Sequence, residues 1–270
     1  QSAILLGEVL DVEMSEDFQG RVAIITGGSD GIGLATATLL AKRGAQVVIC
    51  GRRQALLDSA RDSISAQGGL IEAIQLDVAD TDALTAMIEG VAQKYGRLDM
   101  LVNNAMSTHY APIAKLTLEH WRKDFAVNSD AAFVSTKAAL KVMAEAGKGS
   151  IVNIASTCGI RATVNMASYS ASKAALVHFT AAAAMEAAPL GIRINAIIPG
   201  QVQTAPTELF SARASDTAAR TTAAIPMQRG GQPEELAHAI VFMLSDAASY
   251  ITGTALPVDG GKAAQLYMPG

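Results

Sequence analysis

The 270-residue sequence has few aromatic residues, few charges and only two cysteines. Charged residues make up 17% of the chain and the formal net charge is −4, which argues against an extended basic surface for nucleic acid. Half of the residues are hydrophobic, which excludes a disordered chain. Cys50 and Cys158 are too few for a disulfide framework and lack metal-ligand spacing, as expected in a reducing compartment.

The sequence also lacks a hydrophobic run long enough to cross a bilayer, which takes about 18 charge-free residues. The early apolar stretch SAILLGEVL (2–10) is short and soon meets acidic residues. We therefore expect a soluble, cytoplasmic protein with no membrane or nucleic-acid partner. His120, His178 and His238 lie in helix-like segments without ligand spacing, so we expect no metal site.

Short apolar runs alternate with segments of helical spacing along the chain. Six runs, often β-branched and ending at Gly, Asn, Asp or Pro, predict buried strands at 21–27, 45–50, 72–78, 98–105, 149–156 and 192–200, with a seventh near 255–261. Segments 33–44, 53–69 and 81–96 predict crossover helices. This order predicts an α/β fold, a single-domain Rossmann-like doubly wound parallel sheet with helices on both faces. The expected domain spans 20–270 after an amino-terminal arm at 1–19.

The glycine-rich stretch TGGSDGIG (26–33) follows the first expected strand and opens the first helix. Glycines there allow a tight turn and a close approach of phosphate to free N–H groups at a helix amino terminus. We expect a dinucleotide pyrophosphate to bind at Gly27, Ser29, Asp30, Gly31, Ile32 and Gly33. The alternative is that the glycines only form a turn.

The second expected strand ends in Gly51, Arg52 and Arg53. An acidic residue there would bind the adenosine ribose hydroxyls, whereas a glycine leaves room and arginines pair with a 2′-phosphate, so NADP(H) is favoured over NAD(H). Ordinary solvated arginines are the alternative, and the acidic Asp30 counts against NADP(H).

The third expected strand ends at Asp77 and Val78. We expect Asp77 to reach the adenine amino group, with Val78 beside it at the cofactor. The alternative is that Asp77 caps the next helix, a role for which Asp80 competes.

Tyr169 and Lys173 stand four residues apart in a helix-like stretch of small residues, ASYSASKAALVHF (167–179). Such residues share one helix face, so we expect the ammonium to lower the pKa of the phenol and make it a proton donor and acceptor. Ser156, at the end of a predicted strand, would orient a substrate oxygen. The alternative for the pair is a surface lysine lying beside a half-buried tyrosine.

Together with NNA at 103–105, these residues resemble the short-chain dehydrogenase/reductase family over roughly 18–262. The resemblance implies that Asn128 holds a water in a proton relay, that Lys173 binds the nicotinamide ribose, and that Asn104 and Ala105 line the cofactor. It also implies a carboxamide site, a substrate lid at about 205–228 and a homotetramer. The residues implied for the carboxamide site are Pro199, Gly200, Val202 and Thr204.

The expected function is NADP(H)-dependent interconversion of a carbonyl and a secondary alcohol by hydride transfer, with Tyr169 as general acid and base. The alternatives are a non-catalytic NADP-binding regulatory protein, or an epimerase or dehydratase on the same fold.

One departure from the family pattern is Met106, where NNA is usually followed by glycine. It implies a changed loop path or a side chain toward the substrate. His109 in the same loop either touches substrate or is exposed, and Cys158 either lines the pocket or fills the core.

Overall fold

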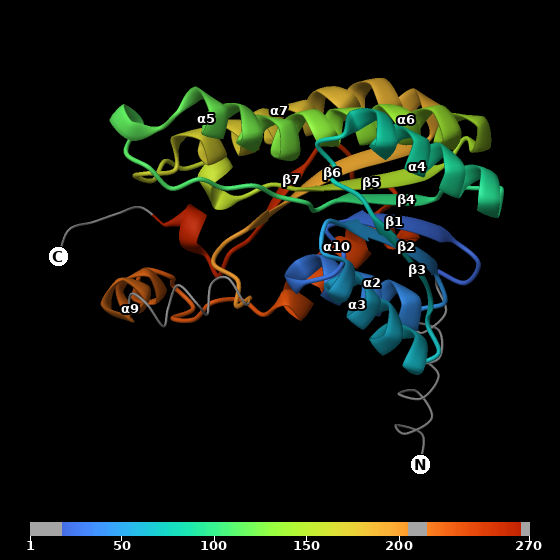
Figure 1. The fold of residues 1–270 in the computed structure, drawn as a ribbon, viewed down its shortest axis with the longest axis horizontal. Helices are drawn as coiled ribbons and strands as arrows, with labels where there is room; N and C mark the ends of the chain where they lie inside the picture. Colours follow the sequence, from blue (N-terminus) through green and yellow to red (C-terminus); the bar gives the residue numbers. More distant parts are fainter. Residues whose placement is uncertain (1–17, 205–214, 266–270) are drawn as a thin grey trace, which may run out of the picture.

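Seven short apolar runs become the strands of one parallel sheet within the described residues, 18–204 and 215–265 of the computed structural model (Figure 1). Their order across the sheet is β3-β2-β1-β4-β5-β6-β7, as the Rossmann-like prediction requires. The strands are β1 (Val22–Thr26), β2 (Gln46–Gly51), β3 (Leu70–Gln75), β4 (Met100–Asn103), β5 (Gly149–Ile154), β6 (Ile192–Pro199) and β7 (Ala255–Val258).

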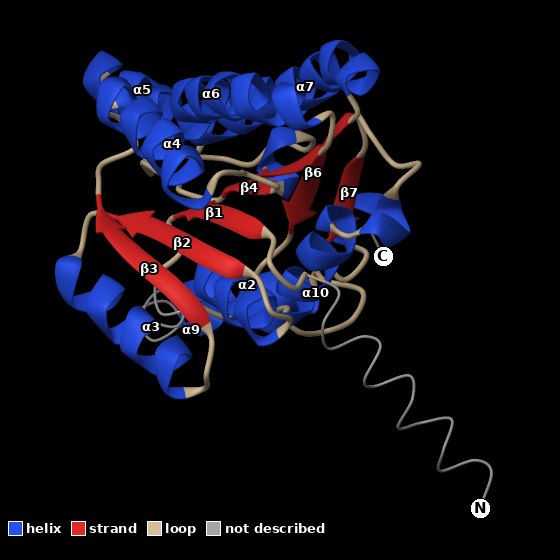
Figure 2. Cartoon of the chain, turned by 90° about the vertical axis from the view of Figure 1, so that its right-hand side faces the viewer, coloured by secondary structure: helices blue, strands red, loops and turns tan. Residues whose placement is uncertain are grey.

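Helices cover both faces of the sheet (Figure 2). On one face lie α2 (Gly31–Lys42), α3 (Gln54–Ala66) and α10 (Pro233–Leu244). On the other lie α4 (Thr81–Tyr95), α5 (Leu118–Phe125), α6 (Ala131–Ala146) and α7 (Ala167–Ala187). A further helix, α9 (Ser215–Ala223), follows β6.

Two hydrophobic cores lie between the sheet and its helical layers. Successive side chains of a strand point to opposite faces, so Ile25 of β1 packs with Leu40 of α2 while its neighbour Ile24 packs with Ile88 of α4. All four side chains are fully buried. This two-sided burial explains why the strands are continuous apolar runs rather than alternating ones.

The third strand and the amino-terminal arm differ from the sequence-based prediction. We expected the third strand at 72–78, but β3 begins at Leu70 and ends at Gln75. It is an edge strand that pairs only with β2, and no residue of it is fully buried, so its bounds are set by the pairing with β2 and not by burial. Phe18, which we expected in the arm, is fully buried. The rest of the arm, 1–17, lies outside the described residues.

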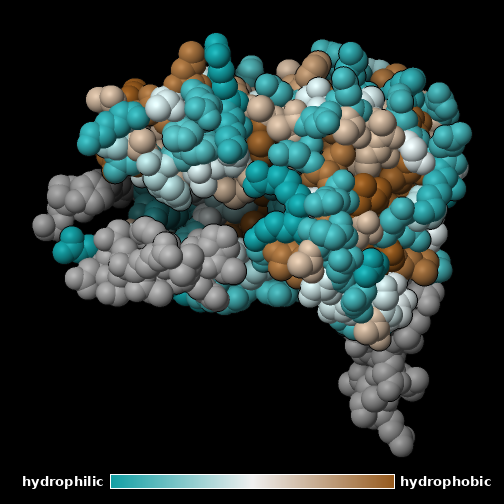
Figure 3. All heavy atoms as spheres, in the orientation of Figure 1, coloured by the Kyte–Doolittle hydropathy of each residue, from teal (hydrophilic) through white to brown (hydrophobic). Residues whose placement is uncertain are grey.

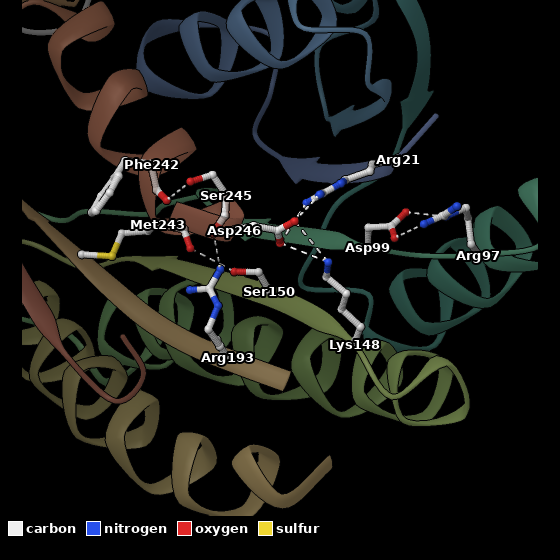
Figure 4. A network of polar contacts seen from close by, with 10 residues as sticks. All are labelled: Arg21, Arg97, Asp99, Lys148, Ser150, Arg193, Phe242, Met243, Ser245 and Asp246. Carbon is white, nitrogen blue, oxygen red and sulfur yellow. Dashed lines mark hydrogen bonds and ion pairs between the residues drawn. The ribbon is translucent and has the colours of Figure 1, made fainter. Parts of the chain in front are cut away.

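Ion pairs and hydrogen bonds join the amino ends of the central strands to the end of α10 (Figure 4). Asp246 pairs with Arg21, just before β1, at 2.6 Å and with Lys148, just before β5, at 3.1 Å. Arg193 of β6 donates to the Ser245 carbonyl at 3.0 Å. The Arg21 guanidinium, and then the Lys148 ammonium, hold the pKa of Asp246 below its usual range. The end of the sheet remote from the glycine turn is thereby tied together.

Candidate active site

Tyr169, Lys173 and Ser156 meet in the interior beside the carboxyl end of β5. Tyr169 and Lys173 lie one turn apart on α7, and Ser156 follows β5 directly. All three are buried, with 8%, 2% and 8% of their surfaces exposed. The Tyr169 phenol interacts with the Ser156 hydroxyl, and the Lys173 nitrogen lies 5.9 Å from the centre of the Tyr169 ring. The alternative of a surface lysine beside a half-buried tyrosine is therefore wrong.

The electrostatics of this cluster differ from our expectation. Burial raises the pKa of Tyr169 to about 12, although the hydrogen bond with Ser156 lowers it in part. Burial also lowers the pKa of Lys173 to about 7. The Lys173 ammonium donates to the Ile154 carbonyl at 2.7 Å. The expected lowering of the phenol pKa by Lys173 is thus corrected, because an amine with a pKa near 7 carries only part of a charge at neutral pH.

Asn128 lies in a single wide π turn, Ala126–Asp130, between α5 and α6. Such turns are frequent at functional sites. Its side-chain amide bonds both backbone groups of Ser107, at 2.9 Å and 2.8 Å, and donates to the Ser172 hydroxyl on α7 at 2.9 Å. Asn128 therefore joins the loop after β4 to the helix that carries Tyr169. Its implied role in a proton relay stays a prediction.

The glycine turn is packed too closely for side chains. Gly27 and Gly31 have positive φ values of 65° and 51°. A Cβ at Gly33 would lie 2.3 Å from the Gly27 carbonyl oxygen, and one at Gly31 would contact Thr204 at 3.1 Å. The predicted turn and the segment that follows β6 are therefore brought together; Pro199 is the last residue of β6 and Gly200 begins that segment. Half-buried Ile32 packs against the core below.

Thr26 organises the NNA segment, and sequence reasoning missed it. Its hydroxyl accepts from the backbone N–H of Asn104 and of Ala105 at 3.0 Å and 3.1 Å. The Asn104 amide donates to the Thr26 and Gly27 carbonyls at 3.0 Å and 2.9 Å, so its side chain supports the turn. A threonine that ends the first strand immediately before the glycines was the available signal.

Asp30 caps α2 by accepting from the Gly31 N–H at 2.8 Å. It also pairs with Arg53 at 3.3 Å on the surface. The Arg52 guanidinium has no ion-pair partner among the described residues, and a Cβ at Gly51 would meet only Ser29 and Leu57, at 3.5 Å and 3.8 Å. The end of β2 thus has space and one guanidinium without an ion-pair partner among the described residues, that of Arg52, whereas Arg53 is paired with Asp30.

The choice between Asp77 and Asp80 as helix cap is settled in favour of Asp80, which accepts from the Ala83 N–H at 3.1 Å. Asp77 accepts from the Ala79 N–H at 3.1 Å through one oxygen. Val78 between them is buried in the core. The adenine contact of Asp77 stays a prediction.

The segment after β6 continues toward the expected lid. Buried Val202 forms a bridge with Gly231 before α10. Of the expected lid at 205–228, residues 205–214 lie outside the described part of the chain. Ile225 is buried and the Met227 N–H donates to the Gly260 carbonyl at 3.2 Å, so the end of the expected lid is anchored next to β7. In the space-filling view, a hollow lies beneath the α5 end of the upper helical layer (Figure 3).

The loop that follows Ala105 has a different character from the one we expected. Met106 is 51% exposed. His109 is not an exposed loop histidine, because its Nδ1 atom lies 2.7 Å from the carboxylate of fully buried Asp124 and its ring stacks on His120. Sequence reasoning did not single out Asp124. Cys158 is half-buried beside Ser156, to whose hydroxyl its N–H donates at 3.1 Å.

The described residues carry neither a membrane-spanning helix nor a cluster of metal ligands. No helix among 18–204 and 215–265 combines the length and apolarity needed to cross a membrane. The same residues contain no group of three or more His, Cys, Asp or Glu side chains placed to hold a metal ion.

Comparison with known proteins places this geometry in one family. Residues 27–263 match the family described as enoyl-(acyl carrier protein) reductase. The chain is 40% identical to cis-4-hydroxycyclohexanecarboxylate dehydrogenase of Sinomonas cyclohexanicum, covering 93% of this chain and 100% of the relative. It is 38% identical to the 3-oxoacyl-(acyl-carrier-protein) reductase FabG of Thermotoga maritima, covering 90% and 98%.

A solved structure gives the same assignment. The putative NAD(P)-dependent gluconate 5-dehydrogenase of Beutenbergia cavernae, which has bound NADP, superposes with a TM-score of 0.87 at 40% identity, covering 92% of this chain and 98% of that one. The chain therefore belongs to the short-chain dehydrogenase/reductase family of oxidoreductases.

Proposed function

We propose that this protein is an NADP(H)-dependent oxidoreductase that interconverts a carbonyl and a secondary alcohol. The observation that carries the proposal is the convergence of a buried phenol, hydroxyl and amine at Tyr169, Ser156 and Lys173. Relatives that match 90% or more of the chain have names that describe dehydrogenases and reductases.

The residues present fit a dinucleotide cofactor. The positive φ values of Gly27 and Gly31 make a turn that side chains would strain. The Lys173 amine has at least two N–H groups whether or not it is protonated, and the described residues give it one acceptor, the Ile154 carbonyl, which leaves a donor for a ribose hydroxyl. When bound, the nicotinamide supplies the hydride donor or acceptor.

Room at Gly51 and the uncommitted Arg52 support NADP(H) rather than NAD(H). The Asp30–Arg53 pair is exposed, so it contributes at most about 1 kcal/mol and a 2′-phosphate can compete for Arg53.

The raised pKa of the Tyr169 phenol suits a proton donor. With a pKa of about 12, the phenol keeps its proton at neutral pH. The Ser156 hydroxyl would orient the substrate oxygen and stabilise negative charge on it, while Tyr169 would give that oxygen its proton. In the reverse direction, the phenolate would accept the proton of the alcohol.

The test is turnover of two probes taken from the relatives, cis-4-hydroxycyclohexanecarboxylate with NADP⁺ and a 3-oxoacyl thioester with NADPH. We expect Tyr169→Phe to lower kcat at least about 100-fold, the usual contribution of general acid–base catalysis, with NADPH affinity unchanged within about twofold. Tyr250→Phe is the matched control because Tyr250 is fully exposed.

Each outcome discriminates between the candidate functions. Full turnover by Tyr169→Phe would overturn the role of Tyr169. Tight NADPH binding without turnover of any carbonyl or alcohol would favour a regulatory protein. Product formed without net consumption of NADPH would indicate an epimerase or dehydratase. A higher kcat/KM with NADH would reverse the cofactor preference.

We also propose a homotetramer and a cytoplasmic location. Large apolar side chains are exposed on α5, α6 and α7, namely Leu118, Phe133 and Met185 at 60%, 51% and 63%. Such exposure on adjacent helices favours contacts between subunits. A sedimentation mass equal to that of the monomer would refute the assembly.

A further inference from the structure

Asp124 of α5 is a fully buried carboxylate that the proposed mechanism does not use. One of its oxygens accepts from the Ser107 hydroxyl at 2.8 Å and lies 2.7 Å from Nδ1 of His109. The other accepts from the Ser168 hydroxyl at 2.6 Å. Both oxygens of the carboxylate are thus engaged.

These contacts join three segments that are distant in sequence. Ser107 and His109 belong to the 107–111 loop, which follows NNA, and Ser168 immediately precedes Tyr169 in the first turn of α7. The loop is tied to the same turn at its other end, where Ala111 forms a bridge with Met166 and donates to the Asn165 carbonyl at 2.9 Å.

Asp124 and Asn128 bind different groups of the same loop residue, Ser107. Asp124 lies near the end of α5 and Asn128 lies four residues later, in the π turn, and both reach Ser107. Asn128 holds its backbone, whereas Asp124 holds its hydroxyl. A carboxylate oxygen only accepts hydrogen bonds, so it fixes the direction of all three donors.

Asp124 needs hydrogen-bond partners, since an isolated buried carboxylate is expensive. His109 is the one ionisable group among the described residues that hydrogen-bonds to it, and the His120 ring stacks on the His109 ring. The carboxylate also acts on Tyr169. Burial is the main cause of the raised pKa of the phenol, and the negative charge of Asp124 adds to it because it disfavours the phenolate; Cys158 and Tyr110 are the other titratable groups that act on the phenol.

We propose that Asp124, with His109 as its partner, is a positioning residue for the reacting tyrosine. It locks the 107–111 loop to the first turn of α7 and places a fixed negative charge near the phenol. This inference rests on the proposed function for its kinetic consequences, but its structural consequence does not depend on turnover.

Three substitutions separate the effect of the Asp124 charge from the effect of its hydrogen bond to α7. Asp124→Asn can keep the hydrogen bonds, because the serine hydroxyl at 168 can accept instead of donate, but it removes the charge. Asp124→Ala removes both. Ser168→Ala cuts only the link to α7 and is the mild variant if Asp124→Ala does not fold. Asp130→Asn is the matched control, since Asp130 is exposed on the same run of helix.

With the 3-oxoacyl thioester and NADPH, we expect Asp124→Ala and Ser168→Ala to lower kcat about tenfold or more, because small displacements of reacting groups are costly. NADPH affinity should stay within about twofold. Asp124→Asn should recover most of that kcat at neutral pH. Its activity in the oxidation direction should begin to rise at a lower pH than in the wild type, since the phenolate is no longer opposed by the carboxylate.

Hydrogen exchange of the 107–111 amides in the cofactor-free protein provides a readout without turnover. It should speed up at least about tenfold in Asp124→Ala and be unchanged in Asp130→Asn. Wild-type exchange in Asp124→Ala would overturn the inference whether or not a substrate is found. So would wild-type kcat in Ser168→Ala, or an unshifted pH profile in Asp124→Asn. An inactive wild type with faster exchange in Asp124→Ala would instead count against the proposed function alone.

Discussion

Replacing Lys173 by methionine tests how much burial of the amine destabilises the folded chain. Lys173 is 2% exposed, and burial lowers its pKa from 10.5 to about 7. Each pKa unit corresponds to about 1.4 kcal/mol, so keeping the amine in the folded interior costs roughly 4 kcal/mol at pH 7. Methionine has a similar length and no charge to desolvate.

The substitution also removes the hydrogen bond from Lys173 to the Ile154 carbonyl, which offsets about 1–2 kcal/mol of the gain. We therefore expect Lys173→Met to raise the free energy of unfolding of the cofactor-free protein by about 2 kcal/mol. For a chain of this size, the thermal midpoint should rise by about 5 °C. Catalytic activity should be lost at the same time, as expected where a functional site is costly to stability.

The pH dependence of the stability gain shows whether desolvation of the amine causes it. Below about pH 7 the amine is protonated in both the folded and the unfolded chain, and its cost is fully present. Above pH 10.5 it is neutral in both, and the cost disappears. The advantage of Lys173→Met should therefore shrink as the pH rises from 7 to 10.5.

Urea unfolding of both proteins across this pH range measures the effect. Lys137→Met, at an exposed lysine of α6, is the control and should show no comparable gain. A variant less stable than the wild type by the same amount at every pH would refute the reasoning, because it would show that Lys173 stabilises the fold by packing alone.

Two further predictions concern the turn and the opposite end of the sheet. Gly33→Ala places a Cβ 2.3 Å from the Gly27 carbonyl oxygen, so we expect a loss of about 1–3 kcal/mol of stability and at least about tenfold weaker NADPH binding by fluorescence titration; unchanged binding would contradict the close packing. Asp246→Asn removes a group whose pKa is lowered in the folded state, so the stability that it contributes is present above about pH 4 and is lost as the pH falls further. The pairs are exposed, so we expect a loss below about 1 kcal/mol that disappears in acid and at high salt; a difference that persists in both would point to packing.

The sequence predicted the strands of a parallel sheet and the meeting of Tyr169, Ser156 and Lys173, because buried parallel strands are apolar throughout and residues four apart share a helix face. It did not predict the pKa of Tyr169, which depends on how completely the surroundings exclude water. Local spacing carries no information on that burial.

The role of Asp124 was also invisible from the sequence. Its partners come from segments up to 44 residues away, and an acid near the end of a polar helix has the same local pattern whether it is buried or solvated. The Asp30–Arg53 pair is a similar case, since it joins two loops 23 residues apart. In both cases the tertiary contact determines the role of the side chain.

The ion pairs around Asp246 lie at the beginnings of β1 and β5, whereas Thr26 and Ser156 stand at or beyond their ends. Strands of five and six residues separate the two by roughly 17–20 Å. Changes in the loops at the carboxyl ends of the strands therefore leave these ion pairs intact. To change specificity without losing stability, substitutions should be made in the loops at the carboxyl ends of the strands, and Arg21, Lys148 and Asp246 should be kept.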